Sequence, residues 1–283
     1  METVYFNGQF MPREQVAISP DDRGFLFGDS VYEVVRWYGG YFFDMEGHMS
    51  RLQRSLKETR IVWEGLGTFP EIAKELVHLN DLGDGCSLVY LQVTRGAAPR
   101  MHAFPEPPVA PTVFASVRRQ SMDTLLWERG VTVDLVPDPR WNRCDIKTTA
   151  LLANILAYQN AHDAGHAEVC FVLDGFLTEG AHSNMFFVKN DTIYTHPEST
   201  HILSGITRKN VIAIAAANDI PLIEEALSES MLPYIHEAFL TNTSGEILPV
   251  LKIGSQQISE GLPGAVTRKL QGLFRERVMA CSR

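Results

Sequence analysis

Residues 131–165 read VTVDLVPDPRWNRCDIKTTALLANILAYQNAHDAG and decide most about the fold of this chain. Apolar residues first alternate with polar ones, which predicts a strand that ends at a proline pair. After Lys147 they recur at the spacing of one helix face, up to a glycine that predicts the end of a helix. Lys147 therefore lies where rigid elements would hold its ε-amine. Such an amine can form a Schiff base when burial or a nearby cation, for which Arg140 and Arg143 are candidates, favours its neutral form. A lone lysine is more often a solvated surface charge, so its meaning depends on the rest of the chain.

Composition limits the function classes. The chain has 283 residues, enough for one large or two ordinary domains. Its formal net charge of −9 disfavours nucleic acid and anionic membranes as general partners. No apolar run is long enough to span a membrane, and the N-terminal residues lack the basic start and apolar run of a signal peptide. We therefore expect a cytoplasmic protein with small-molecule ligands.

The cysteines give no sign of a metal site. They lie at positions 86, 144, 170 and 281, without a Cys-x-x-Cys pair and without a His/Cys cluster at zinc spacing. Reduced and mostly buried thiols are the expectation, with no bound metal.

The order of the predicted elements favours an α+β fold. In the first part we expect strands at 3–6, 9–11, 30–38, 41–44, 87–94 and 112–117, and helices at 48–60 and 70–79. In the second part we expect strands at 131–136, 168–173, 176–178, 184–189, 192–195 and 237–241, and helices after Lys147, at 205–218 and at 266–278. Grouped strands broken by a few helices indicate mixed or antiparallel sheets. A polar stretch at 118–123 places the domain boundary, giving domains 1–120 and 121–283. No Gly-x-Gly-x-x-Gly follows a first strand, which argues against a Rossmann fold.

Two segments have the chemistry of a phosphate site. Residues 204–208 (SGITR) open a helix, and a helix N-terminus presents free N–H groups and a positive dipole end. Residues 241–246 (TNTSGE) form a hydroxyl-rich turn after a strand. Each also has a plainer interpretation, as a helix cap or an ordinary loop.

Three further segments carry charged side chains that suit ligand binding. Glu179, in a loop of small residues, can accept a hydrogen bond from a protonated ring nitrogen or simply cap a turn. The 93–102 loop carries Arg100, and a guanidinium is the preferred bidentate partner of a carboxylate. His48 and Arg51 lie one helical turn apart, as an anion anchor or as an exposed polar face.

Taken in this order, the segments resemble the fold-type IV pyridoxal 5′-phosphate enzymes, a family with D-amino acid aminotransferase, branched-chain aminotransferase and aminodeoxychorismate lyase branches. The resemblance covers nearly the whole chain and rests on residues 22–29 (DRGFLFGD), His48-x-x-Arg51, 144–147 (CDIK), 178–180 (TEG), 205–208 (GITR) and 243–244 (TS). It is greatest to the D-amino acid branch, because of the 93–102 loop and Tyr32. It implies a two-domain α+β fold with mixed and antiparallel sheets flanked by helices, in which the larger C-terminal domain carries the cofactor lysine.

The resemblance also implies roles for cofactor-binding residues. Lys147 would hold pyridoxal 5′-phosphate as an internal aldimine and then act as the acid–base of the proton shift. Glu179 would pair with the protonated pyridine nitrogen and keep the ring an electron sink. Leu203 would pack on one face of the cofactor. The phosphate would be bound by Arg51, Ile206, Thr207, Thr243 and Ser244.

Substrate recognition follows from the same resemblance. Tyr32, Arg100 and His102 would bind the substrate α-carboxylate. In the family the last two typically reach across from the second subunit, which implies a homodimer.

Other residues would act around these groups. Arg140 and Glu168 would act indirectly, by tuning the ring hydroxyl and Lys147. His182 departs from the small hydroxyl residue expected near the cofactor, and Arg36 and Trp37 are expected to reshape the pocket beside Tyr32.

The expected activity is ping-pong transamination between D-amino acids, such as D-alanine or D-glutamate, and 2-oxo acids, such as pyruvate or 2-oxoglutarate. The alternatives are a branched-chain L-amino acid aminotransferase, an aminodeoxychorismate lyase, and a binding or structural protein without cofactor. Arg100 and His102 favour the D-amino acid alternative, and the presence of both Lys147 and Glu179 argues against a protein without cofactor.

Overall fold

The computed structural model describes residues 2–121, 123–258 and 260–281. The chain forms two compact units: unit 1 is Met1–Ser121 with Ile146–Leu151, and unit 2 is Met122–Asp145 with Leu152–Arg283. The sequence prediction placed Lys147 in a domain 121–283, whereas its segment packs in unit 1. The reason is backbone pairing, because Tyr32 N donates to Lys147 O at 3.0 Å.

Unit 1 contains an antiparallel sheet in the strand order β2-β1-β5-β4-β3. Its strands are β1 (Thr3–Phe6), β2 (Gln9–Pro12), β3 (Ser30–Tyr38), β4 (Cys86–Thr94) and β5 (Val113–Arg119). β3 and β4 pair along their whole length, from Ser30 opposite Thr94 to Tyr38 opposite Cys86. This register puts Val31, Val35 and Trp37 on one face of the sheet.

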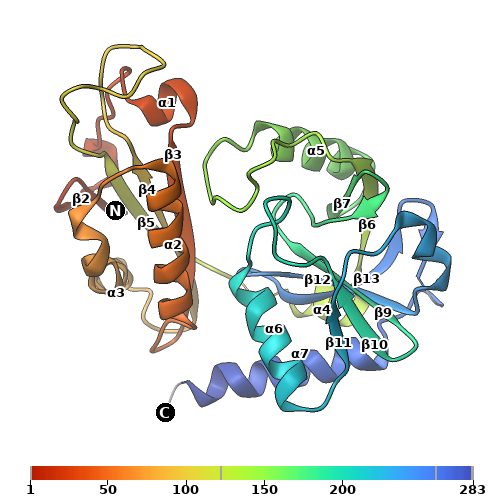
Figure 1. The fold of residues 1–283 in the computed structure, drawn as a ribbon. Coiled ribbons are helices and arrows are strands. Elements are labelled where there is room, and N and C mark those ends of the chain that lie inside the picture. The colour runs from red at the N-terminus through yellow and green to blue at the C-terminus, as the bar shows by residue number, and fades with distance from the viewer. Residues whose placement is uncertain (1, 122, 259, 282–283) are drawn as a thin grey trace. The chain divides into compact units, whose positions relative to one another are not determined.

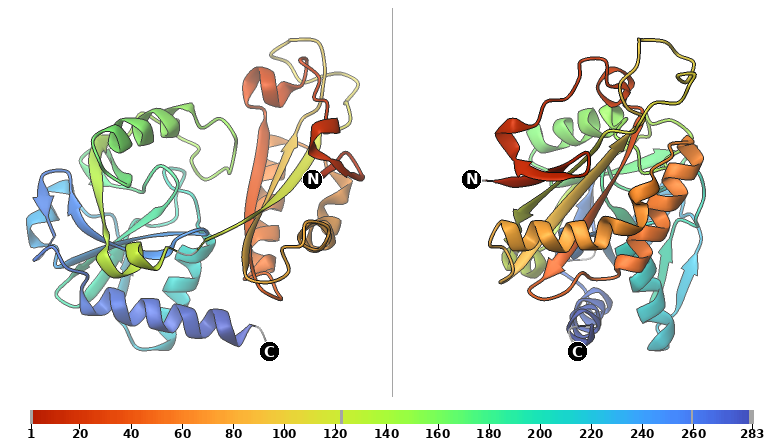
Figure 2. Two further views of the ribbon diagram at one scale, coloured as in Figure 1. Left: turned by 180° about the vertical axis from the view of Figure 1, so that it is seen from behind. Right: turned by 90° about the vertical axis from the view of Figure 1, so that its left-hand side faces the viewer.

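Helices cover the apolar face of this sheet (Figures 1 and 2). The helical segments of unit 1 are η1 (Arg13–Gln15), α1 (Arg23–Phe27), α2 (Met45–Thr59), η2 (Glu64–Thr68) and α3 (Phe69–Leu79). Leu52 of α2 and Phe69 of α3 are fully buried in one core with Val35 and Leu91 of the sheet. α2 begins where the Asp44 side chain accepts from Gly47 N, which satisfies a backbone donor that the helix itself leaves without a partner.

Unit 2 is built around a mixed sheet in the order β11-β10-β9-β12-β13-β6-β7-β8, with β14 beside β13. Its elements are α4 (Thr124–Arg129), β6 (Val131–Pro137), α5 (Leu152–Asp163), β7 (Glu168–Leu173), β8 (Phe176–Leu177), β9 (Asn184–Lys189), β10 (Thr192–Thr195), α6 (Ile206–Ala217), β11 (Leu222–Glu224), η3 (Glu229–Tyr234), β12 (Glu237–Asn242), β13 (Glu246–Ile253), β14 (Gln256–Gln257) and α7 (Ala265–Ala280). β6 runs parallel to both β13 and β7, whereas β12 is antiparallel to β9 and β13. α5 packs on β6 and β7, and α6 packs on α7 and β12 (Figure 1). The predicted α+β class with mixed and antiparallel sheets is confirmed.

Most predicted elements are confirmed, with boundaries shifted by a few residues. The strand predicted at 41–44 is wrong: Phe42 forms only an isolated bridge with Trp37, because the chain enters the cap of α2 at Asp44. α4 and β13 were not predicted. β13 carries Pro249 in its middle, which weakens a strand pattern in the sequence. No helix among the described residues is long and apolar enough to cross a membrane.

Candidate active site

Lys147 lies in an extended segment on the edge of the unit 1 sheet. Val31 of β3 forms an isolated bridge with Thr148, and Lys147 N donates to the Ser55 hydroxyl of α2 at 3.3 Å. The backbone is thus held by a strand and a helix. The half-buried side chain places Nζ 4.2 Å from the centroid of the Tyr32 ring. The structure therefore brings together the predicted cofactor lysine and one predicted substrate-binding residue.

A buried carboxylate that the sequence analysis missed holds both polar residues of the His48-x-x-Arg51 motif. Arg51 Nε and Nη2 donate to the two oxygens of Glu33 at 2.7 and 2.8 Å, and His48 Nδ1 lies 2.9 Å from Glu33 Oε2. Glu33 is fully buried, on the same face of β3 as Val31 and Val35. An acid within an apolar alternation was the signal that could have identified it.

The electrostatics of this cluster favour an ionised Glu33. Burial raises the pKa of Glu33, but the Arg51 charge and the hydrogen bonds from Arg51 and His48 outweigh it and hold the pKa well below its usual range. Burial lowers the pKa of His48. Glu33 therefore orients the Arg51 guanidinium on α2 through two charge-assisted bonds.

In unit 2, Glu179 lies at the end of the β7–β8 region and is 4% exposed. Arg140 Nη1 donates to its Oε1 at 2.6 Å. Its Oε2 accepts from the Asn184 side chain at 2.9 Å and from Leu203 N at 3.0 Å. Asn184 Nδ2 also donates to Leu203 O at 2.8 Å. The predicted residues Glu179, Arg140 and Leu203 are thus brought together, and Asn184 is a further member that the sequence analysis missed.

This cluster holds two carboxylates and one guanidinium. Arg140 Nε and Nη2 donate to the two oxygens of Asp138 at 2.9 and 2.7 Å. The Arg140 charge is therefore shared between Asp138 and Glu179. Burial raises the pKa of Glu179 to about 7, against the opposing effect of Arg140. A protonated ring nitrogen next to Glu179 would supply the second positive charge.

Glu168 and His182 form a second buried pair in unit 2. His182 Nδ1 lies 2.6 Å from Glu168 Oε2. The same carboxylate accepts from the Ser183 hydroxyl at 2.8 Å and from Ala181 N at 3.0 Å. Burial raises the pKa of Glu168, but the His182 hydrogen bond and charge outweigh it and lower the pKa. His182 is half exposed and packs edge-on against Tyr158 at 5.2 Å. His182 thus fixes the Glu168 carboxylate within the loop that carries Glu179.

The start of α6 has the backbone geometry of an anion site. Gly205 is its N-cap and provides no side-chain hydrogen bond, so the first N–H groups of Ile206 and Thr207 have no cap. A Cβ at Gly205 would overlap Asn184 Oδ1, so a glycine is required for close approach. Thr207 is buried. The β12–β13 turn carries Thr243 and Ser244, whose hydroxyl donates to Asn242 Oδ1 at 3.0 Å.

The loop between β4 and β5 presents the other predicted substrate-binding residues. Arg100 and His102 are exposed. Both lie against Phe27 of α1: the Arg100 guanidinium carbon is 5.1 Å and the His102 ring 5.7 Å from the Phe27 ring centroid. Arg100 and His102 are thus presented together at one aromatic ring. Trp37 packs in the core on the opposite face of β3 from Tyr32, whereas Arg36 is buried on the Tyr32 face.

Comparison with known proteins assigns the family. Residues 30–253, more than half of the chain, match the family described as amino-transferase class IV. The chain belongs to the class IV aminotransferases. It is therefore an aminotransferase whose cofactor is pyridoxal 5′-phosphate, which confirms the resemblance seen in the sequence.

Among characterised relatives, D-alanine aminotransferases of Staphylococcus haemolyticus and Bacillus licheniformis are 37% and 38% identical to this chain. The matches cover 98% of this chain in both cases, and 98% and 97% of the relatives. The branched-chain amino acid aminotransferase of Escherichia coli has a similar structure, with a TM-score of 0.89 at 25% identity over 97% of this chain and 94% of that one. A branched-chain amino acid aminotransferase of T.th. origin, solved with pyridoxamine 5′-phosphate, also has a TM-score of 0.89, at 26% identity over 99% and 95%.

Proposed function

We propose that this enzyme transfers the amino group between D-amino acids, of the D-alanine and D-glutamate type, and 2-oxo acids such as pyruvate or 2-oxoglutarate. The observation that carries this proposal is the identity of 37% to D-alanine aminotransferases over 98% of both chains. The paired Arg100 and His102 side chains beside Phe27 support it, because a guanidinium and an imidazole at one surface suit a carboxylate.

The residues of the two units fit the cofactor. We propose that Lys147 binds it covalently and that Glu179 accepts a hydrogen bond from its ring nitrogen, where the Asp138–Arg140–Glu179 cluster has an excess of negative charge. Leu203 would contact its ring. Its phosphate would bind to groups that share donor chemistry, namely Arg51, Ile206 N, Thr207, Thr243 and Ser244.

When bound, pyridoxal 5′-phosphate supplies a ring that delocalises negative charge from the substrate α-carbon. The chain's own residues then have separate tasks. Lys147 Nζ removes and returns the proton at the substrate α-carbon, and Tyr32, Arg100 and His102 orient the substrate carboxylate. Arg140 and Asn184 hold the Glu179 carboxylate in place, while His182 and Ser183 hold that of Glu168.

A paired assay tests the proposal. The purified enzyme is given D-alanine or L-leucine, each with 2-oxoglutarate, and initial rates are compared at equal concentrations. We expect a rate with D-alanine well above that with L-leucine. A preference for L-leucine would assign the enzyme instead to branched-chain substrates, the substrates named for the two structurally similar enzymes.

We further propose that the enzyme is a cytoplasmic homodimer. Leu152, Ile155 and Leu156 lie at helical spacing on α5 and are 70, 58 and 57% exposed. Apolar side chains at this spacing form one stripe, which is typical of a surface that a second subunit covers. Sedimentation equilibrium should give twice the chain mass of 31.7 kDa, and Leu156→Lys should shift it toward the monomer. A monomer in the unchanged protein would contradict the dimer. Export of the protein in a cell fractionation would contradict the location.

A further inference from the structure

The loop that carries Arg100 and His102 is closed at its base by one carboxylate. The hydroxyls of Thr94, at the end of β4, and Thr112, before β5, donate to Asp22 Oδ2 at 3.1 and 2.6 Å. Asp22 is also the N-cap of α1, where its Oδ1 accepts from Gly24 N at 2.8 Å. The loop and α1 are thus joined at the point where the loop leaves the sheet (Figure 1).

The next residue of α1, Arg23, reaches the far part of the same loop. It is 4% exposed. Its Nη1 donates to the carbonyls of Met101 at 2.6 Å and Ala103 at 3.3 Å, the two residues that flank His102. The 95–112 connection contains no helix or extended strand of its own, and such loops are ordinarily mobile. A buried guanidinium bound to the main chain on both sides of His102 restrains it.

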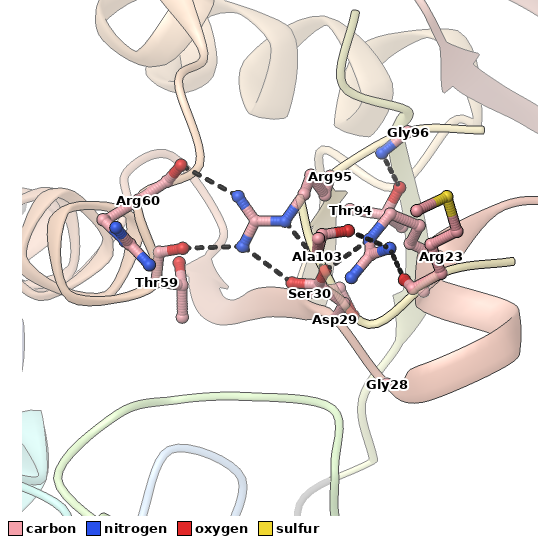
Figure 3. Close-up of polar contacts among 12 residues, drawn as sticks. Arg23, Gly28, Asp29, Ser30, Thr59, Arg60, Thr94, Arg95, Gly96 and Ala103 are labelled. Atoms are coloured by element: carbon pink, nitrogen blue, oxygen red, sulfur yellow. Dashed lines mark hydrogen bonds and ion pairs between the residues drawn. The ribbon is translucent and has the colours of Figure 1, made fainter. Parts of the chain in front are cut away.

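Arg23 is itself held by a network that extends to α2 (Figure 3). Asp29 Oδ2 accepts from Arg23 Nε at 2.8 Å and from Arg95 Nε at 2.8 Å. Arg95 continues to the carbonyls of Thr59 and Arg60, at 2.7 and 2.9 Å, at the end of α2. Burial raises the pKa of Asp29, but the hydrogen bonds from Arg95 and Arg23 lower it below its usual value. The carboxylate is therefore ionised between two guanidinium groups, which fixes their positions.

We propose that Arg23 is a positioning residue for recognition of the substrate carboxylate: by holding the backbone around His102, it keeps His102 and Arg100 oriented for binding. The inference rests on the proposed function, in which these two residues bind that carboxylate. Arg23 itself need not touch the substrate, because its donors are directed to Asp29, Met101 and Ala103. Without Arg23, ordering of the loop becomes part of each binding event, and the cost appears as weaker substrate binding.

The test compares Arg23→Met with Arg60→Met in the complete holoenzyme. Arg60 is an exposed arginine of the same neighbourhood whose guanidinium stacks on Phe104, so its replacement removes the same charge without freeing Met101 or Ala103. Arg23→Met should raise KM for both D-alanine and pyruvate about tenfold, as expected for loss of a charge-assisted bond, and change kcat much less. Arg60→Met should leave both constants unchanged, and Arg23→Lys should restore part of the loss. Hydrogen exchange of the peptide around His102 should become faster in Arg23→Met only.

A double-mutant cycle with Arg100→Ala separates this inference from the proposed function. If Arg23 acts through the loop, Arg23→Met should add little to the effect of Arg100→Ala on KM. Additive effects, or an unchanged KM in Arg23→Met when Arg100→Ala raises it, would overturn the positioning role alone. An unchanged KM in Arg100→Ala would overturn both proposals. Should Arg23→Met fail to fold, Arg23→Lys takes its place in the cycle, with a smaller rise in KM and the same lack of additivity expected.

Discussion

At the scale of single residues, Lys147 combines a fixed backbone with a half-buried amine beside Tyr32. We expect Lys147→Ala to abolish transamination while the fold remains, because the contacts that hold this segment to β3 and α2 are made by its backbone. Borohydride reduction of the holoenzyme and peptide mapping should place the pyridoxyl group on Lys147. Lys57→Ala, at an exposed position of α2, is the control and should keep full activity. A label on a different lysine would refute the assignment.

Glu179 gives a prediction about turnover. In Glu179→Gln the cofactor ring loses its anionic partner. Loss of such electrostatic stabilisation costs about 3 kcal/mol, or about a hundredfold in turnover. Cofactor absorbance should be retained. Asn184→Ala, which leaves the carboxylate in place but removes one of its donors, should cost less. Turnover close to normal in Glu179→Gln would count against the role.

The same residue gives a pH dependence of stability. Burial raises the pKa of Glu179 from 4.5 to about 7, so between these values the folded state binds more protons than the unfolded state. The contribution of Glu179 to stability is therefore complete below about pH 4.5 and is lost as the pH rises through 7. In urea denaturation of the cofactor-free protein, the stability difference between the unchanged protein and Glu179→Gln should shift toward the variant from pH 5 to pH 8. A constant difference would show that Glu179 is ionised throughout.

Arg100 is expected to act on ground-state binding of the substrate. Its loss in Arg100→Ala removes a charge-assisted bond worth about 1.5–3 kcal/mol, so KM for D-alanine should rise about ten- to a hundredfold. An amine substrate without a carboxylate should be affected much less, because it never formed the bond. Equal damage to both substrates would mean that Arg100 supports structure instead.

At the scale of elements, the Glu33 ion pair joins β3 to α2. Glu33→Ala would leave Arg51 buried without its carboxylate partner, and breaking such a pair costs about 3–5 kcal/mol of folding stability. The double variant Glu33→Leu with Arg51→Met should recover much of this loss, since it removes both charges. Chemical denaturation of the cofactor-free proteins measures both values. A Glu33→Ala protein as stable as the double variant would show that the pair has no structural role.

Local patterns in the sequence were sufficient for most elements but not for their partners. Alternation identified β3, and helical spacing identified α2 and α3, because both signals depend on neighbouring residues. Glu33 is 18 residues from Arg51, and Glu179 is 39 residues from Arg140. Such pairs depend on how elements pack, which no local pattern encodes. For the same reason the backbone pairing of the Lys147 segment with β3 was not predicted.

At the scale of the whole molecule, the family resemblance supplied what local patterns could not. Lys147 and Glu179 were identified as a pair only because their motifs occur in the family's order, and the family assignment is confirmed by residues 30–253. The roles of the individual site residues remain predictions. Asp138 and Asn184 were missed because their side chains face other protein groups, which gives them no separate signature in the sequence.

The homodimer leads to a prediction about mixed subunits. If Arg100 and His102 reach the active site of the partner subunit, a dimer of one Lys147→Ala chain and one Arg100→Ala chain contains one complete site, with Lys147 from one chain and Arg100 from the other. Random reassociation of equal amounts makes half of the dimers mixed, each with one of its two sites complete. The activity at low D-alanine should then recover to about a quarter of the unchanged enzyme. Each variant is unfolded and refolded alone as the control, and should stay near its own low activity. If Arg100 serves the site of its own chain, the mixed dimer has no complete site, and activity after mixing should equal the mean of the two variants.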